Sequence, residues 1–283
     1  MLTKCGHCQP NAFRLLETRA IKLLMQIAGI GRIIFWSGGS LWIGRAFAPS
    51  EFHSHHAIQV SIGLSDRVQF RNSEATPWQF FDAVAIPPDL THAFQAPGCL
   101  VVQLFCEPES ALGRNLLSRF GSGRLQRIPS SDIASNVKGL RAAFEKGLGD
   151  EELEEIALET LYSLSGRAPT GLVDERILRA AAFIGARFSE PLTLGEVARH
   201  VGLSSGRFRH LFSEGTGISF RAYLLWTRLN RALELGFGGM SWTDAAHATN
   251  FADSAHLSRT MRRMFGIAPS SLRQDLPSRS MTA

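Results

Sequence analysis

The stretch that decides the fold is Leu192–Phe212, which reads LTLGEVARHVGLSSGRFRHLF. Thr193 and Glu196 have the spacing of a capping box, in which each residue satisfies a backbone N–H of the other, and they predict the start of a helix. Gly202 ends that helix, because a tight turn needs a left-handed residue. Ser204 then caps a second helix. The stretch predicts two short helices joined by a tight turn.

The second of these helices has one apolar face and one free face. Phe208, Leu211 and Phe212 recur at helical spacing and predict the buried face. A second helix that exposes its other side after a short turn is the geometry that enters a DNA major groove. The residues expected on the free side are Ser205, Gly206, Arg207, Arg209 and His210.

The same pattern returns about fifty residues later, between Trp242 and Phe265. Asn250 takes the turn position, because Asn is the next best residue to Gly in a left-handed conformation. Asp253 caps the second helix, and apolar residues continue from there at helical spacing. The residues expected outward or near DNA phosphates are Ser254, Ala255, His256, Arg259, Arg262 and Arg263.

A long helix is expected between the two units, over residues 219–235. It would span about 25 Å at about 1.5 Å per residue, and could hold two recognition helices about one DNA turn, roughly 34 Å, apart. Residues 174–275 contain 13 Arg, no Lys and 9 acidic residues, which is four of the five net positive charges of the chain. An Arg-only basic set suits phosphate and guanine contacts, although a GC-rich genome would also produce it.

Residues 174–274 resemble the DNA-binding domain of the AraC/XylS family of bacterial transcription regulators. The resemblance rests on Phe251–Arg259 (FADSAHLSR), Phe265–Ser270 (FGIAPS) and Gly217–Tyr223 (GISFRAY). It covers about a third of the chain. It implies base contacts from the positions matching Gly206, Arg209 and His210 in the first unit and Ser254, Ala255 and Arg259 in the second.

Two departures from the family pattern bear on DNA reading. The usual turn glycine of the second unit is Asn250, and Gly206 stands where a larger side chain often reads DNA. We therefore expect the first unit to rely mainly on Arg209 and His210. In the second unit Arg259 is the expected base reader, since an Arg on guanine discriminates by about 1–3 kcal/mol. Arg262 and Arg263 are expected on phosphates or on a solvated face.

The N-terminal part has a different pattern, with short runs rich in Ile, Val, Phe and Trp between residues 31 and 106. Several of the runs alternate, and they recur about every ten residues. This spacing is typical of a small antiparallel barrel or sandwich. Aromatic residues that could line such a barrel, or equally pack its core, are Trp36, Trp42, Phe70 and Trp78.

His53-Ser-His55 with Gln59 four residues on, followed by Ile86-Pro-Pro-Asp-Leu-Thr-His92, resembles the paired signatures of the cupin barrel. In cupin enzymes these positions hold a divalent metal. The resemblance therefore implies a metal site at His53, His55, Gln59 and His92, although Gln in place of Glu removes a negative ligand. The same residues could instead line an effector pocket or only pack and hydrogen-bond. No cofactor is expected to be required.

The expected fold class is α+β, with a cupin-like barrel, a helical connector, and an all-α domain holding two helix-turn-helix units. The expected segments are an N-terminal extension (1–30), the sensor barrel (31–130), a connector (131–165), a linker (166–173), the DNA-binding domain (174–275) and a disordered tail (276–283). The apolar stripe of the connector could pack on the barrel or form a dimer seam.

The N-terminal region raises two further questions. Cys5 and Cys8 have the spacing of half a zinc site, yet no second Cys-x-x-Cys follows, which favours a disordered extension over a metal. The apolar stretch 21–44 contains Arg32 and Gly38-Gly39, which favour strands joined by a turn over a membrane helix. We expect a cytoplasmic protein with no membrane partner.

These observations together predict a sequence-specific transcription regulator that acts as an activator, and not an enzyme. The expected partners are double-stranded promoter DNA, a small-molecule effector in the barrel, a second copy in a homodimer, and RNA polymerase in the case of activation. The alternative is a cupin metalloenzyme with an appended helical domain. Gln59 at the acid position and the complete pair of helix-turn-helix units argue against that alternative.

Overall fold

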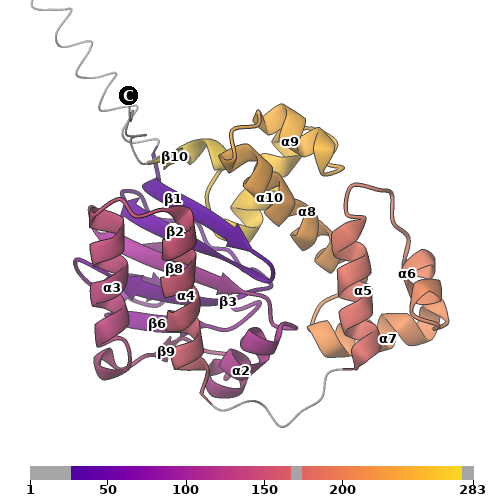
Figure 1. Ribbon diagram of the computed structural model, residues 1–283, viewed down its shortest axis with the longest axis horizontal. Coiled ribbons are helices and arrows are strands. Elements are labelled where there is room, and N and C mark those ends of the chain that lie inside the picture. Colours follow the sequence, from indigo (N-terminus) through magenta and orange to yellow (C-terminus); the bar gives the residue numbers. More distant parts are fainter. Residues whose placement is uncertain (1–26, 167–173, 276–283) are drawn as a thin grey trace, which may run out of the picture.

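The computed structural model describes residues 27–166 and 174–275, and within them the chain has an α+β fold (Figure 1). Residues 1–26, with Cys5 and Cys8, and the tail from residue 276 lie outside these ranges, as does the linker except for Gly166. The strands are β1 (Gly29–Trp36), β2 (Gly39–Ala46), β3 (Ile58–Gly63), β4 (Val68–Arg71), β5 (Gln79–Phe81), β6 (Ala83–Ile86), β7 (Ala93–Gln95), β8 (Leu100–Cys106), β9 (Gln126–Arg127) and β10 (Leu272–Gln274).

The helices fall into two groups. Those that follow the barrel in sequence are α2 (Ala111–Phe120), α3 (Ala134–Glu145) and α4 (Asp150–Ser165). Those of the C-terminal domain are α5 (Glu175–Ala186), α6 (Leu194–His200), α7 (Ser205–Thr216), α8 (Phe220–Phe237), α9 (Trp242–Ala248) and α10 (Ser254–Phe265). Short 3-10 turns lie at Ser130–Asp132 and Pro269–Ser271. Within the described ranges no helix has the length and apolar character needed to cross a membrane.

The N-terminal domain consists of two sheets that face each other. One has seven strands in the order β10-β1-β2-β8-β3-β6-β9, and the other has three in the order β5-β4-β7. From Gly29 onward, the apolar stretch that contains Arg32 forms the hairpin β1–β2, and Gly38 turns it with φ +88°. Arg32 is buried and hydrogen-bonds Asp150 at the start of α4 (3.0 Å from Nε). The expectation of strands rather than a membrane helix is therefore confirmed.

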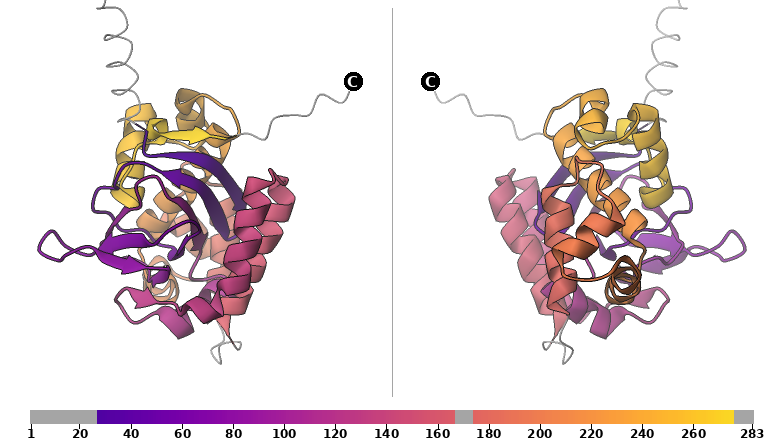
Figure 2. Two further views of the ribbon diagram at one scale, coloured as in Figure 1. Left: turned by 90° about the vertical axis from the view of Figure 1, so that its left-hand side faces the viewer. Right: turned by 90° about the vertical axis from the view of Figure 1, so that its right-hand side faces the viewer.

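Side chains alternate across the large sheet, and each face has its own covering. Leu41 and Ile43 of β2 pack in one core with Leu140 of α3 and Leu161 of α4. Trp42, between them, packs in a second core with residues of the C-terminal domain. Figure 2 shows α3 and α4 on one side of the sheet and the C-terminal helices beyond the other. The connector stripe thus packs on the barrel, one of the two alternatives left open by its pattern.

The C-terminal domain is helical, as its sequence predicts, and it ends in one short strand, β10, that the sequence did not predict. β10 pairs in parallel with β1, with Gly29 opposite Leu272 and Gly31 opposite Gln274. The chain thus returns from its last helix to the edge of the first strand (Figure 1). Because β10 covers the free backbone groups of an edge strand, it joins the two domains through one sheet.

Candidate DNA-binding surface and histidine cluster

The first helix-turn-helix unit, α6 and α7, forms through the predicted local signals. The backbone N–H of Thr193 donates to the Glu196 carboxylate (2.8 Å), and the Glu196 N–H donates to the Thr193 hydroxyl (3.3 Å), which completes the capping box. Gly202 turns the chain at φ +72°. The Ser204 hydroxyl then accepts from the N–H of Arg207. Each predicted role of these residues is confirmed.

The second unit, α9 and α10, has the same construction with different residues. The Ser241 hydroxyl caps α9 by accepting from the N–H of Asp244. Asn250 makes the turn with φ +60°, as its position predicts. The Asp253 carboxylate accepts from the N–H of His256 (2.6 Å) and starts α10. Two helices of equal length, twelve residues each, therefore follow equivalent turns.

The outer faces of α7 and α10 are free for a ligand. All five residues predicted on the free side of α7 are exposed, and a side chain added at Gly206 would meet no atom within 4 Å. On α10, Ala255 and the three arginines are exposed, whereas Ser254 and His256 are half-buried. The His256 ring lies edge-on to Phe251, with centroids 5.1 Å apart. The exposed arginines on the two faces are Arg207, Arg209, Arg259, Arg262 and Arg263.

Helix α8 connects the two units, as its sequence predicts (Figure 1). Its 18 residues span about 27 Å at about 1.5 Å per residue. Arg228 of this helix donates to the carbonyls of Phe188 (2.9 Å) and Glu190 (2.8 Å), and Arg231 pairs with Glu234 (2.7 Å). Both arginines therefore form contacts within the C-terminal domain.

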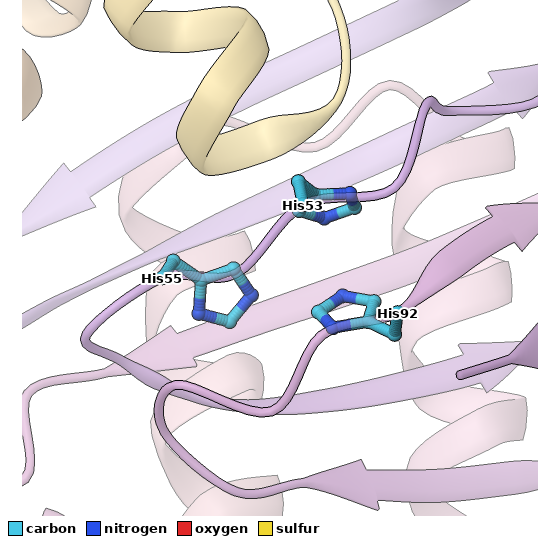
Figure 3. Close-up of side chains that lie close together, drawn as sticks. All are labelled: His53, His55 and His92. Carbon is cyan, nitrogen blue, oxygen red and sulfur yellow. The ribbon is translucent and has the colours of Figure 1, made fainter. Parts of the chain in front are cut away.

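A cluster of three histidines lies at the end of the barrel that faces α10. His53, His55 and His92 are buried, and they offer ligand atoms that all lie within 4.8 Å of one another (Figure 3). His53 and His92 face each other because each backbone N–H donates to the other residue's carbonyl (2.9 Å). Their ring centroids are 4.2 Å apart. The structure thus brings together all three histidines that the cupin resemblance singles out.

Each of these imidazoles is held by a backbone carbonyl at Nδ1. The acceptors are the carbonyls of Glu51 for His53 (2.8 Å), Ala57 for His55 (2.9 Å) and Leu90 for His92 (2.8 Å). A carbonyl can only accept, so Nδ1 carries the proton in each neutral ring and Nε2 keeps its lone pair. The Nε2 atom of His92 is buried and has no hydrogen-bond partner among the described residues.

Burial keeps these rings neutral. Desolvation, with the nearby His55, lowers the pKa of His53 to about 3, and desolvation lowers the pKa of His55 to about 4. Burial, together with the charges that His53 and His55 would carry, lowers the pKa of His92 well below its usual value. Neutral imidazole is the form that binds metal ions.

Gln59 lies beside the cluster, as the motif predicts. Its Oε1 atom is 2.8 Å from Nε2 of His55, and its amide donates to the Ser61 hydroxyl (2.8 Å) and to Gln103 (2.5 Å). The sequence reasoning missed Ser61 and Gln103, which sit on β3 and β8. A signal for them was present in the alternation of these strands, where each polar residue stands between buried aliphatic ones.

The backbone of Glu51 links the histidine cluster to the end of α10. The Glu51 carbonyl accepts from His53, while the Glu51 N–H donates to the carbonyl of Gly266, which ends α10 (2.9 Å). Phe265, the last residue of α10, stacks on Trp42 with centroids 4.9 Å apart and an interplanar angle of 30°. Helix α10 therefore ends directly against the barrel.

The free space beside the cluster is small. A cavity of about 110 Å³ is lined by His53 and Gln59 of the barrel and by Phe265 of α10. Of the four aromatic residues predicted as a lining, only Trp42 contributes to it; Phe70 is in the core between the sheets. Pockets for drug-sized ligands are usually about 300–1,000 Å³. This cavity is therefore suited to an ion or a very small molecule.

Comparison with known proteins agrees with this architecture. The family described as "Helix-turn-helix domain" matches residues 197–275. An uncharacterized HTH-type transcriptional regulator of Staphylococcus aureus is 30% identical over 107 residues, 38% of this chain and 14% of that protein. The regulatory protein PocR of Salmonella typhimurium is 31% identical over 151 residues, 53% of this chain and 48% of PocR. The chain thus spans less than half the length of these relatives.

Similarity to solved structures extends over both domains. The crystal structure of ToxT from Vibrio cholerae O395 has a TM-score of 0.53 at 12% identity, covering 82% of this chain and 95% of ToxT. An apo variant of ToxT from strain SCE256 gives 0.55 at 11% identity, covering 84% and 97%. Residues 197–275 therefore match a helix-turn-helix domain, and over 84% of its length the chain has a fold similar to that of ToxT.

Proposed function

We propose that this chain is a transcription regulator that binds promoter DNA through α7 and α10. The observation that carries the proposal is the pair α7 and α10. Both helices are capped and expose arginines, α8 connects their two units, and they lie within a segment that matches a helix-turn-helix family. Arginine guanidinium groups bind guanine edges and phosphates. We infer that Arg259 reads a base, that Arg209 and His210 serve the first unit, and that Arg262 and Arg263 hold phosphates.

The test compares specific and random DNA by fluorescence anisotropy, after an operator is selected from a random library. Arg259→Ala is expected to weaken specific binding about ten- to a hundredfold, since a base contact by Arg contributes about 1–3 kcal/mol. Binding to random DNA should change little. Arg141→Ala, on the exposed face of α3, is the matched control and should change neither. Equal losses on specific and random DNA would assign Arg259 to a phosphate.

The histidine cluster supports a second element of the proposal, a divalent transition metal ion held by His53, His55 and His92. The residues fit such an ion because three neutral imidazoles converge, each fixed at Nδ1 by a carbonyl, and Nε2 of His92 is unpartnered. Gln59 Oε1 and Nε2 of neutral His55 are two acceptors facing each other, which a cation or a proton between them would stabilise. The ion would supply a positive charge beside the end of α10.

Metal analysis and calorimetric titration with Zn²⁺ test this element. His92→Gln should abolish stoichiometric binding, and His210→Gln, on the exposed face of α7, should leave it unchanged. Unchanged zinc binding in His92→Gln would remove the cluster as the site. DNA binding by the metal-free protein is measured in the same series, so that the DNA-binding proposal and the metal-site proposal are tested independently.

We also propose that the chain has no catalytic activity of its own and works with a small-molecule effector. The acid ligand of the cupin signature is Gln59 here, and the cavity of about 110 Å³ beside the histidines offers little room for a substrate. ToxT, which shares the fold, has been solved with an unsaturated fatty acid bound. A homodimer on a two-part operator and contact with RNA polymerase, in the case of an activator, complete the proposal; light scattering and in vitro transcription test them.

A further inference from the structure

A second and much larger cavity lies between the two domains. It measures about 780 Å³, which is within the range of about 300–1,000 Å³ typical of small-molecule sites. One wall comes from the barrel, at the β1–β2 turn and the segment after β8, and the other from α5 and α8. We call this cavity the interdomain cleft. Its apolar walls include Phe35, Trp36 and Leu178, and Leu178 is 40% exposed.

The interdomain cleft contains an unbalanced pair of acidic residues. Glu107 and Glu109 follow β8 and line the cleft. The Glu109 carboxylate pairs with the buried His56 ring (2.9 Å). Arg231, which also lines the cleft, pairs with Glu234. Among the residues described, Glu107 therefore has no ion-pair partner, and the lining carries an excess of negative charge.

Two buried polar atoms in the same place lack a well-aligned hydrogen bond. They are Nε1 of Trp226, which has the Glu107 carboxylate nearby, and Oε1 of Glu109, which has the Tyr223 phenol nearby, and both side chains line the cleft within the described ranges. Trp226 is 2% exposed and Glu109 is 4% exposed. Leaving a buried polar atom without a hydrogen bond costs about 1–3 kcal/mol, so a ligand that donates to Glu109 would be favoured there.

The charge state of the acids points in the same direction. Burial and the nearby Glu109 carboxylate raise the pKa of Glu107, because a second negative charge is unfavourable beside another one away from bulk water. The phenol of Tyr223, opposite on α8, has its pKa raised by burial and by both carboxylates. A positive charge in the cleft would relieve this repulsion, whereas a carboxylate ligand would increase it.

We propose that the interdomain cleft binds a small organic cation, a protonated amine with an apolar body. The ammonium group would lie between Glu107 and Glu109, and the apolar body would lie against Phe35, Trp36 and Leu178. A ligand held between β8 and α8 touches both domains, so it would favour the docked arrangement over any in which they separate. The effect on DNA affinity rests on the function proposed above, and the binding itself does not.

The test uses two ligands of equal chain length and opposite charge, octylamine and octanoate, titrated into the full chain by calorimetry. Octylamine should bind, and octanoate should bind at least about tenfold more weakly. Glu107→Gln, which keeps shape and removes charge, should weaken octylamine by about tenfold, equivalent to about 1.4 kcal/mol. Glu155→Gln, exposed on α4, is the matched control and should bind as the native chain does.

A second pair of variants locates the site. Gly185 on α5 lines the cleft, and a side chain added there would meet no atom within 4 Å. Gly185→Trp should therefore fill the cleft and abolish octylamine binding, while Gly185→Ala should retain it. Circular dichroism and thermal unfolding confirm that each variant folds.

Three results would overturn the proposal. They are equal affinity for octanoate, octylamine affinity unchanged in Glu107→Gln, and binding that persists in Gly185→Trp. DNA binding is measured on the same samples. Octylamine binding by a chain that does not bind DNA would sink the proposed function alone, whereas DNA binding without octylamine binding would sink this inference alone.

Discussion

Gly266 is the residue at which the second recognition helix meets the barrel, and changing it tests how the domains are joined. It ends α10 in a left-handed conformation, with φ +70°. A Cβ atom added there would lie 2.4 Å from the Glu51 carbonyl oxygen and 2.6 Å from Nδ1 of His53. Gly217 ends α7 in the same way, with φ +80°, but a Cβ there meets no atom within 4 Å. Gly217→Ala is thus a matched control for Gly266→Ala.

The two variants share one cost and differ in another. Alanine in a left-handed position costs about 1–2 kcal/mol in either helix. Gly266→Ala must also displace the Glu51 peptide, which donates to Gly266 and accepts from His53. At about 1 kcal/mol for each of these two hydrogen bonds, the added cost is about 2 kcal/mol. A difference of 1.4 kcal/mol corresponds to a factor of ten. Amides at the domain contact should therefore exchange about thirtyfold faster in Gly266→Ala than in Gly217→Ala.

Hydrogen exchange followed by mass spectrometry measures this difference directly. Peptides covering Glu51 and β10 should lose protection in Gly266→Ala and keep it in Gly217→Ala. Both variants should keep the helical circular dichroism of the native chain. Equal exchange at these peptides in the two variants would refute the reasoning, since it would mean that the close approach of Gly266 does not hold the domains together.

Three further predictions concern charge. The first concerns chelator-treated protein, in which the folded pKa values of His53 and His55 are about 3 and 4. Below pH 6.5 the unfolded chain therefore binds more protons than the folded chain. The free energy of unfolding should fall as the pH is lowered from 6.5 to 4, by up to about 1.4 kcal/mol per pH unit for each histidine. Denaturant unfolding measures it, and an equal slope in His53→Gln and His210→Gln would contradict it. The second concerns salt: the logarithm of the DNA association constant should fall steeply with the logarithm of the salt concentration, and Arg262→Ala should reduce the slope of this plot by about one. An unchanged slope in this variant would mean that Arg262 does not contact a phosphate. Arg32→Met should lower the free energy of unfolding by about 1–3 kcal/mol, because it leaves the Leu148 carbonyl without its donor. Arg45→Met, exposed on β2, should change it little. Similar values for the two variants would mean that the hydrogen bonds of Arg32 contribute nothing to stability.

The features that sequence predicted are those set by neighbours in the chain. The Thr193–Glu196 capping box, the turn at Gly202 and the positive φ of Asn250 all depend on residues within one helical turn. The strands followed from alternation in the same way. The gathering of His53, His55 and His92 was predicted by resemblance to a family signature, because no local pattern brings His92 to the other two.

The features that sequence did not predict depend on contacts between distant segments. β10 has three residues, too few for a periodic pattern, and it exists because β1 offers an open edge more than 200 residues earlier. The ion pair of Glu109 with His56 also joins distant segments, since 53 residues separate the two in the chain. The interdomain cleft forms only when α5 and α8 pack beside the barrel. Docking geometry of this kind has no local signature.

The small cavity and the interdomain cleft share one lining residue, and this predicts that their ligands affect each other. Phe105 lines both spaces, and Trp226, which lines the cleft, has its ring centroid 6.3 Å from that of His55. An ion that orders His55 would therefore restrict Trp226, and an amine that orders Trp226 would restrict His55. Thermodynamic linkage requires the two effects to be equal, so zinc must change octylamine affinity by the same factor as octylamine changes zinc affinity. Titrations of each ligand with and without the other measure both factors. A factor of one in both would mean that the two spaces act independently, despite the side chains between them.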